Sequence, residues 1–211
     1  MRKLGLPFTS KRNILLSGSE FNDPIAKTVS WSPLANTSIH FQSHILEQDS
    51  ESLHFLPSNF SKMVTFAYIL IGLFSLGEGL MEYTDIIKNQ GAPYLPVSFG
   101  LFVIFFGIIN WSLVYHKITF SKKSMNCELD FLICKKMIDI DAILGLQIIP
   151  EKVIIDDYSY SHFELIMVTS QLKRFLLLAH GSKDNLCKDA QDAAKFLGVP
   201  LWDGTRYTDL S

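Results

Sequence analysis

The amino-acid sequence predicts an α+β membrane protein, with an antiparallel transmembrane helix hairpin and a small β-rich domain that ends in a helix. Three features of the chain predict this class: two long apolar segments, a series of short alternating segments, and an amphipathic segment near the C-terminus. The 211 residues are 48% hydrophobic and 19% charged. This composition suits one modest soluble domain joined to membrane segments.

The second apolar segment, residues 97–116, is the clearer of the two membrane predictions. It contains no Asp, Glu, Lys or Arg, and it has the roughly 20 residues that a spanning helix needs. The first segment, residues 63–83, is free of charge only as far as Gly77. At about 1.5 Å per residue, the charge-free part is too short for a hydrocarbon core of about 30 Å. Glu78 is therefore expected at the outer boundary of the membrane.

Glu78 also has a functional interpretation. In that alternative it is an intramembrane acid that relays a proton or pairs with Asn110 on the second helix, because a short connection makes the two helices antiparallel neighbours. An ionised carboxylate in the middle of a bilayer is costly, whereas one near a helix end reaches headgroups or water. The boundary position is the favoured interpretation.

The lysines near the membrane ends predict the orientation of the hairpin. Five lysines follow the second segment, Lys62 precedes the first, and the loop between the segments has only Lys88. Because Lys and Arg are enriched on the cytoplasmic side, both termini are expected in the cytoplasm. Residues 1–30 lack the apolar core of a cleavable signal, so no processing is expected.

The chain is expected to divide into four regions. Residues 1–35 are rich in Ser, Asn and Pro without a sustained period and should be mostly irregular. Residues 36–62 alternate apolar and polar residues around the polar "EQDS", which predicts a pair of strands. Residues 63–116 hold the membrane hairpin. Two strands alone are marginally stable, so the strand pair is expected to join residues 117–211 in one cytosolic unit.

Residues 117–211 are predicted to form a β-rich domain with a C-terminal helix. Seven segments are interpreted as strands: "KITFS", "CELDFLIC", "KMIDID", "LGLQIIP", "KVIID", "HFELIMV" and "KRFLLLA". The helix is predicted over residues 183–197, with Ser182 as its N-cap and Gly198 as its stop. Its apolar stripe, which should cover a small curved sheet, consists of Leu186, Ala190, Ala193 and Leu197.

Several classes of function are disfavoured. The net charge of −2 is spread without a long basic block, so no nucleic-acid partner is expected. The three cysteines lie outside any CxxC spacing, and the six histidines form no paired spacing with them, so no metal is expected. No GxSxG, P-loop, HExxH or GxGxxG motif occurs. The chain is therefore interpreted as a protein without catalytic residues or a cofactor.

The polar stretch "DDYSYS", residues 156–161, is interpreted as a solvated loop. Its two tyrosines, Tyr158 and Tyr160, are the candidates for recognition of a partner, because aromatic side chains on a loop are frequent binding residues.

Four segments resemble an uncharacterised family of bacterial membrane proteins: "ILGLQIIPEKV", "HFELIMV", "RFLLLAHG" and "DAQDAAKFLGVPLWD". The resemblance spans about residues 31–204. It implies a two-helix membrane hairpin, a pleckstrin-homology-like β-barrel or sheet with a C-terminal helix, and a location in the bacterial inner membrane. It implies no catalytic residues. One departure is the turn at Ser170 and Gln171, where such proteins often have Asp-Gly.

Two hypotheses about function follow. The favoured one is a non-catalytic inner-membrane protein whose cytosolic domain binds a protein or a lipid headgroup, with the hairpin keeping the domain close to the bilayer. The alternative is a subunit of a membrane transport or secretion assembly that packs through its hairpin. Membrane lipid is a partner in both, and a protein partner or a second copy of the chain is expected.

Overall fold

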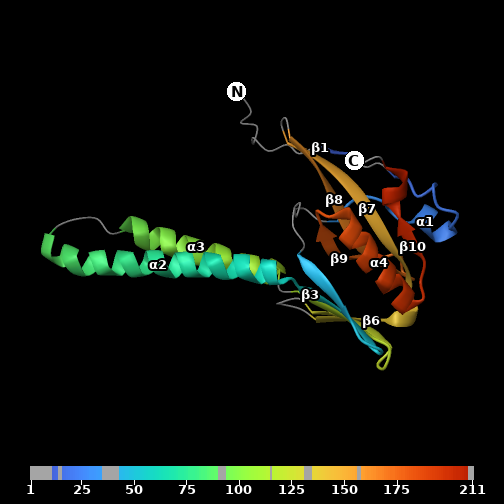
Figure 1. Ribbon diagram of the computed structural model, residues 1–211, viewed down its shortest axis with the longest axis horizontal. Helices are drawn as coiled ribbons and strands as arrows, with labels where there is room; N and C mark the ends of the chain where they lie inside the picture. The colour runs from blue at the N-terminus through green and yellow to red at the C-terminus, as the bar shows by residue number, and fades with distance from the viewer. Residues whose placement is uncertain are drawn as a thin grey trace.

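The structure, a computed structural model, is an α+β fold, whose described residues form two β-sheets and four α-helices. A pair of long helices projects from one side of the two-sheet domain (Figure 1). The structure describes residues 11–13, 16–34, 43–89, 94–114, 116–130, 135–155 and 158–208. Within these ranges it leaves out the side chains of residues 11–13, 82–89, 94–96, 110, 112–114, 153–155 and 158–159.

Sheet B is an antiparallel meander in the order β2-β3-β4-β5-β6. Its strands are β2 (His44–Gln48), β3 (Ser52–Pro57), β4 (Lys117–Ser121), β5 (Asn126–Asp130) and β6 (Lys135–Asp139). β3 and β4 pair directly, although the two long helices separate them in the sequence. The strand pair that precedes the helices and the strands that follow them are therefore parts of one sheet.

Sheet A is built around one long strand, β7. Its strands are β1 (Lys11–Asn13), β7 (Ile143–Ile155), β8 (Tyr158–Thr169), β9 (Arg174–His180) and β10 (Leu201–Asp203). β8 lies along one side of β7, while β1 and β10 both pair with β7, at residues 152–154 and 146–148. Two 3-10 helices, η1 (Ile140–Ala142) and η2 (Gly204–Tyr207), precede β7 and follow β10.

Two predicted strand boundaries in this sheet are wrong. "LGLQIIP" and "KVIID" are not separate strands, because β7 continues through Pro150. Proline removes a backbone donor, and Pro150 lies between the residues that pair with β10 and those that pair with β1, so on that side of β7 no described strand pairs with it. The second error concerns residues 158–161 of the predicted "DDYSYS" loop, since β8 begins at Tyr158 and pairs with β7 from there on. Asp156 and Asp157 lie outside the described residues.

One hydrophobic core is shared by both sheets and by α4 (Lys183–Leu197). Sheet B contributes Leu53, Phe55, Ile118, Phe120, Cys127 and Leu129, and sheet A contributes Leu146, Ile148, Phe163, Leu165, Met167, Leu177 and Leu178. The Phe55 and Phe120 rings meet edge to face with their centroids 6.3 Å apart. Because the three layers bury their apolar side chains in the same core, they form one folding unit.

The N-terminal region packs onto sheet A although it has little regular secondary structure. Residues 16–34 include α1 (Pro24–Thr28), which begins after Asp23, whose carboxylate accepts a hydrogen bond from the Ile25 N–H at 2.8 Å. Phe21 and Trp31 stack with ring centroids 4.7 Å apart and are buried against the second face of sheet A. Most of the described residues 16–34 lie outside any helix or strand, as expected of a mostly irregular segment, but their packing onto sheet A was not predicted.

α4 covers the predicted range, Lys183–Leu197, and ends at Gly198 in the left-handed conformation with φ 69°. Leu186, Ala190 and Ala193 are buried in the shared core, as the predicted stripe requires, and Ala194 and Phe196 join them. Ser182 occupies the N-cap position without a side-chain capping bond. Its backbone N–H instead donates to Nδ1 of His180 at 2.9 Å.

Asp189 gives α4 a pH-dependent contribution to stability. Burial, and then the nearby Asp192 carboxylate, raise the pKa of Asp189 to about 6, although Lys188 opposes the shift. Ionisation therefore destabilises the folded state above pH 6, and this penalty disappears below the ordinary carboxyl pKa of 3.8. Asp189→Asn is expected to raise the melting temperature well above pH 6, by the equivalent of ~1 kcal/mol after solvent screening.

Thermal unfolding of the full chain in detergent at three pH values checks this expectation. The difference in melting temperature between Asp189→Asn and wild type should shrink as the pH falls through 6 and vanish below 3.8. Asp184→Asn, in the exposed first turn of the same helix, is the control and should not stabilise the protein. An Asp189→Asn variant that melts like wild type at every pH would contradict the assignment.

The helix pair consists of α2 (Asn59–Asn89) and α3 (Tyr94–Val114). α2 extends past the predicted range 63–83 at both ends, and α3 begins before the predicted range 97–116. A Cβ atom built on Gly72 would lie 2.9 Å from the Gly100 carbonyl oxygen, and one built on Gly107 would lie 3.3 Å from Cβ of Tyr68. The later residue of α2, Gly72, meets the earlier residue of α3, Gly100, whereas Tyr68 meets Gly107. The two helices are therefore antiparallel, and their backbones approach closely.

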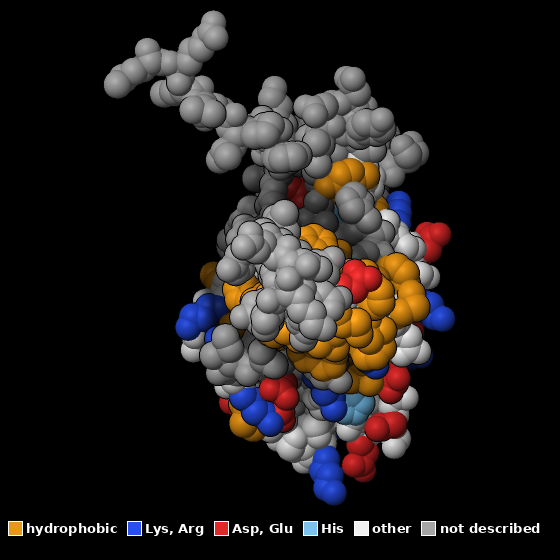
Figure 2. Space-filling model, turned by 90° about the vertical axis from the view of Figure 1, so that its left-hand side faces the viewer, with side chains coloured by type: hydrophobic (Ala, Val, Ile, Leu, Met, Phe, Trp, Pro, Cys, Tyr) orange, Lys and Arg blue, Asp and Glu red, His pale blue; other side chains and the backbone are white. Residues whose placement is uncertain are grey.

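Apolar side chains are exposed on the described parts of both long helices. The exposed large apolar residues on α2 and α3 are Phe60, Met63, Phe66, Leu70, Ile71, Leu73, Phe74, Leu80, Met81, Phe99, Leu101, Phe102, Phe105, Phe106, Ile108 and Ile109. Figure 2 shows apolar side chains gathered over the helix pair, with charged side chains around the domain behind it. In the described part of the chain, Asn59–Met81 is long and apolar enough to cross a membrane, while α3 has a shorter apolar stretch, Val97–Ile109.

A buried polar junction fixes the base of α2 to the domain. Ser58 Oγ accepts the Ser61 N–H at 3.1 Å and caps the first turn, and Ser61 Oγ donates to the Ser43 carbonyl at 3.0 Å. Ser43 Oγ in turn donates to the Ala179 carbonyl of β9 at 3.1 Å. The ring of His44 on β2 packs against the ring of His116, just beyond α3, with centroids 4.2 Å apart and ring planes tilted by 47°. Both ends of the helix pair are therefore attached to the sheets.

Candidate functional site

A cluster of two glutamates and one histidine lies on the face of sheet A that residues 16–34 cover. Glu151 comes from β7, and His162 and Glu164 come from β8. Glu151 pairs directly with His162 across the two strands. Side chains two residues apart on a strand point to the same face, so Glu164 joins them. The antiparallel register alone brings the three together.

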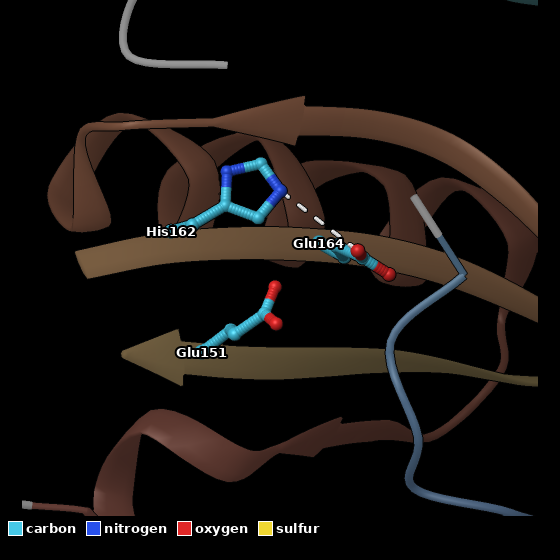
Figure 3. Close-up of side chains that lie close together, drawn as sticks. All are labelled: Glu151, His162 and Glu164. Carbon is cyan, nitrogen blue, oxygen red and sulfur yellow. Dashed lines mark ion pairs between the residues drawn. The ribbon is translucent and has the colours of Figure 1, made fainter. Parts of the chain in front are cut away.

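The three side chains are among the most deeply buried charged or titratable groups in the described residues. Glu151, His162 and Glu164 are 2%, 1% and 0% exposed. One ligand atom from each lies within 4.8 Å of the other two, and Nε2 of His162 is 3.8 Å from Oε1 of Glu164. Figure 3 shows the Glu151 carboxylate directed toward the other two side chains. Buried carboxylates at this spacing need a compensating positive charge.

The covering segment contributes polar contacts around the cluster. The backbone N–H of Leu34 donates to Oε2 of Glu164 at 2.7 Å. Arg174 on β9 donates through Nη2 to the Ser32 carbonyl at 2.5 Å. Partial burial lowers the pKa of Arg174, whereas the Glu164 carboxylate opposes that shift, which places the guanidinium charge close to Glu164. Arg174 therefore supplies one positive charge to this face of the sheet.

Chemically, the Glu151–His162–Glu164 cluster has donors for a cation and groups that exchange protons. Two carboxylates and an imidazole are common metal ligands, and the same groups serve as general acids and bases. A catalytic group must come within hydrogen-bond reach of its substrate. These three side chains are at most 2% exposed, so the fold would have to open before a substrate could reach them. The geometry favours a bound ion or an internal proton-sharing cluster over catalysis.

A second candidate site is a pocket of about 270 Å³ between β6 and the turn from β8 to β9. Its lining residues are Lys136, Met137, Ile138, Asp139, Ala142, Thr169, Ser170, Gln171, Lys173 and Phe175. Nζ of Lys136 lies 4.1 Å from the centroid of the Phe175 ring, so this contact joins β6 to β9. Among the described strands, β6 is at the end of sheet B and β9 is at the end of sheet A.

The structure does not bring the predicted site residues together. Tyr160 is half-buried in β8. Tyr158 is the first residue of the same strand, and its side chain is not among those that the structure describes. Their predicted loop position is wrong, because the β7 register continues to Tyr158. Glu78 is an exposed residue on α2, and Asn110 belongs to α3 with a side chain outside the described residues.

The Glu151–His162–Glu164 cluster was not predicted from the sequence. Paired cysteines and histidines are the usual sequence signal of a metal site, whereas this cluster combines one histidine with carboxylates. The detectable signal is the spacing of His162 and Glu164 within "HFELIMV", which places two polar side chains on one face of a strand. Glu151 adds the third only through the register of β7 and β8.

Comparison with protein-family models, curated proteins and solved structures finds no match. The resemblance to bacterial membrane proteins with a pleckstrin-homology-like portion therefore stays a prediction.

Proposed function

We propose that this chain is a non-catalytic integral membrane protein whose two-sheet domain binds a partner protein at the cytoplasmic face of the bacterial inner membrane. In this proposal α2 and α3 form a transmembrane hairpin, and both termini are cytoplasmic. The observation that carries the proposal is the insertion of an apolar, exposed helix pair between two adjacent strands, β3 and β4.

The exposed side chains of the helix pair support a membrane environment. Soluble monomers rarely expose contiguous apolar patches larger than a few hundred Å², whereas large apolar side chains are exposed along both helices here. A helix that is apolar on all sides needs lipid or other protein around it. Glu78 on α2 lies beyond the charge-free part of the helix, as expected for a residue at the membrane boundary.

The junction at the base of α2 supports a role in which the domain stays at the membrane surface. Ser61 on α2 is hydrogen-bonded to Ser43, and Ser43 to β9. The two polypeptide connections at β3 and β4 also leave the domain little freedom to move away from the helices. We infer that the strands and C-terminal helix form a pleckstrin-homology-like scaffold, whose function depends on its binding site.

The pocket between β6 and β9 is the proposed binding site for an acidic, extended segment of the partner. Strand edges accept extended peptides through main-chain hydrogen bonds, and here the ends of both sheets border one pocket. Lys136 and Lys173 provide positive charge, and Met137 on β6 is 63% exposed. Flexible apolar side chains such as methionine suit partner surfaces.

Site-specific photo-crosslinking in native membranes tests this function. A photoreactive amino acid at Met137 is expected to give a discrete crosslinked protein, and the combined change Lys136→Glu and Lys173→Glu should abolish it through charge repulsion. Lys122→Glu is the matched control, because Lys122 is also an exposed lysine over an aromatic ring, 4.3 Å from the Phe196 centroid, and it does not line the pocket. This control should keep the crosslink.

Other outcomes point to other functions. Crosslinks to phospholipid alone would contradict a protein partner and favour a lipid headgroup. A crosslink that survives both charge reversals but is lost when α2 and α3 are replaced by an unrelated antiparallel pair of apolar helices would favour the assembly subunit. A Met137 probe that yields no specific crosslink would contradict the proposed site.

A further inference from the structure

We propose that Glu151, His162 and Glu164 bind one divalent transition-metal ion, of the Mn²⁺, Fe²⁺ or Zn²⁺ class, inside the domain. This ion would be held under residues 16–34 and would stabilise their docking onto sheet A. The site is separate from the partner-binding pocket and from the membrane helices.

The spacing of the donor atoms fits a shared ion. Carboxylate oxygen and imidazole nitrogen lie about 2.0–2.2 Å from a bound zinc ion, so two donors on one ion are separated by up to about 4.4 Å. The candidate atoms of the cluster already lie within 4.8 Å of one another. Small rotations of the glutamate side chains would close the remaining difference, because both strands hold the backbone in register.

The charge of the cluster also favours a bound cation. Glu151 and Glu164 are buried to 2% and 0% exposure, and an uncompensated buried carboxylate costs several kcal/mol. In the described surroundings Arg174 supplies one positive charge near Glu164. A bound dication would offset the remaining carboxylate charge, and the neutral imidazole of His162 would be one of its ligands.

The donor set selects the class of metal. Calcium and magnesium prefer oxygen ligands, whereas an imidazole nitrogen together with carboxylates suits manganese, iron or zinc. The Leu34 N–H that donates to Oε2 of Glu164 at 2.7 Å orients this carboxylate, as hydrogen bonds from outside the ligand set commonly do in metal sites. Oε1 of Glu164 then faces His162. The same hydrogen bond links the proposed ion to the covering segment.

The competing explanation is a cluster that shares protons and binds no ion. Metal analysis of the tag-free full-length protein, purified in detergent without chelator, separates the two. The proposal expects about one bound metal per chain, and Mn²⁺, Fe²⁺ or Zn²⁺ added to chelator-treated protein should raise its melting temperature by several degrees. Ca²⁺ and Mg²⁺ should leave it unchanged. Protein that contains no metal and melts identically with and without all of these ions would overturn the proposal.

Two variants test whether a bound metal is held by these three residues. Glu151→Gln keeps the shape of the side chain but removes its charge, and it should lower metal content at least tenfold and eliminate the metal-dependent rise in melting temperature. Glu47→Gln, on the exposed side of β2, is the control and should bind metal like wild type. Should Glu151→Gln fail to fold, Co²⁺ added to wild-type protein gives an independent readout, since imidazole ligation of Co²⁺ produces visible absorption bands. Full metal binding by Glu151→Gln, or Co²⁺ spectra without nitrogen ligation, would refute the site.

Discussion

Leu186→Asp is expected to unfold the two-sheet domain. Leu186 is 0% exposed in the core that α4 shares with both sheets. A carboxylate at this position would lose its hydration without gaining a partner, at a cost of several kcal/mol. Native domains are stable by only about 5–15 kcal/mol in total, so this one change removes a large part of the stability.

Thermal unfolding and limited proteolysis of the full chain in detergent measure the effect. Asn185→Asp is the matched control, because it adds the same charge one residue earlier, at an exposed position in the first turn of α4. There the helix dipole favours a negative charge. We expect only Leu186→Asp to be digested rapidly and to lose the cooperative thermal unfolding transition. Equal melting temperatures for both variants would show that the Leu186 face of α4 does not pack in the core.

α4 was predictable because several local signals agree. Its apolar positions follow the helical period, and Gly198 occupies a left-handed conformation that glycine adopts without strain. Asp184 in the first turn and Lys195 in the last turn complement the helix dipole. Each of these features is encoded within a few residues, so the predicted range of residues 183–197 equals the observed one.

Segments of β7, β8 and β9 were predicted as strands, but the places of β1 and β10 in sheet A could not be predicted, because these two strands pair with a distant part of the chain. β1 pairs with β7 about 140 residues later in the chain, in the register Lys11 to Ile154, and no local pattern encodes this register. β7 and β8 are also buried on both faces, one against the shared core and one against residues 16–34. A clean alternation of polar and apolar residues, which would mark one solvent face, is therefore missing.

The candidate site depends on the register of the β7–β8 hairpin. His162 and Glu164 share one face of β8 by the period of a strand, but the position of Glu151 opposite His162 requires the β7–β8 register. Pro150 beside Glu151 indicates a strand break when the sequence is considered alone. The structure keeps β7 continuous at this point, and that continuity completes the cluster.

Gly100→Leu is expected to separate the two long helices. A Cβ atom on Gly100 would lie 2.9 Å from the Gly72 carbonyl oxygen and 2.9 Å from the Leu76 backbone nitrogen. Backbone atoms cannot rotate away as a side chain does, so the helices must shift, at a cost of ~1–3 kcal/mol or more. Small residues at such contacts are the usual basis of helix association in membranes.

Disulfide crosslinking between the helices measures this separation. The pair Tyr68→Cys and Gly107→Cys suits the assay, because a Cβ atom on Gly107 would lie 3.3 Å from Cβ of Tyr68, close to the ~3.8 Å spacing of a disulfide. Gly77→Leu is the matched control, since a Cβ there meets nothing within 4 Å. We expect Gly100→Leu to reduce crosslinking severalfold in membranes, while Gly77→Leu leaves it unchanged. Equal crosslinking in both variants would mean that the close contact at Gly72 and Gly100 does not hold the helix pair together.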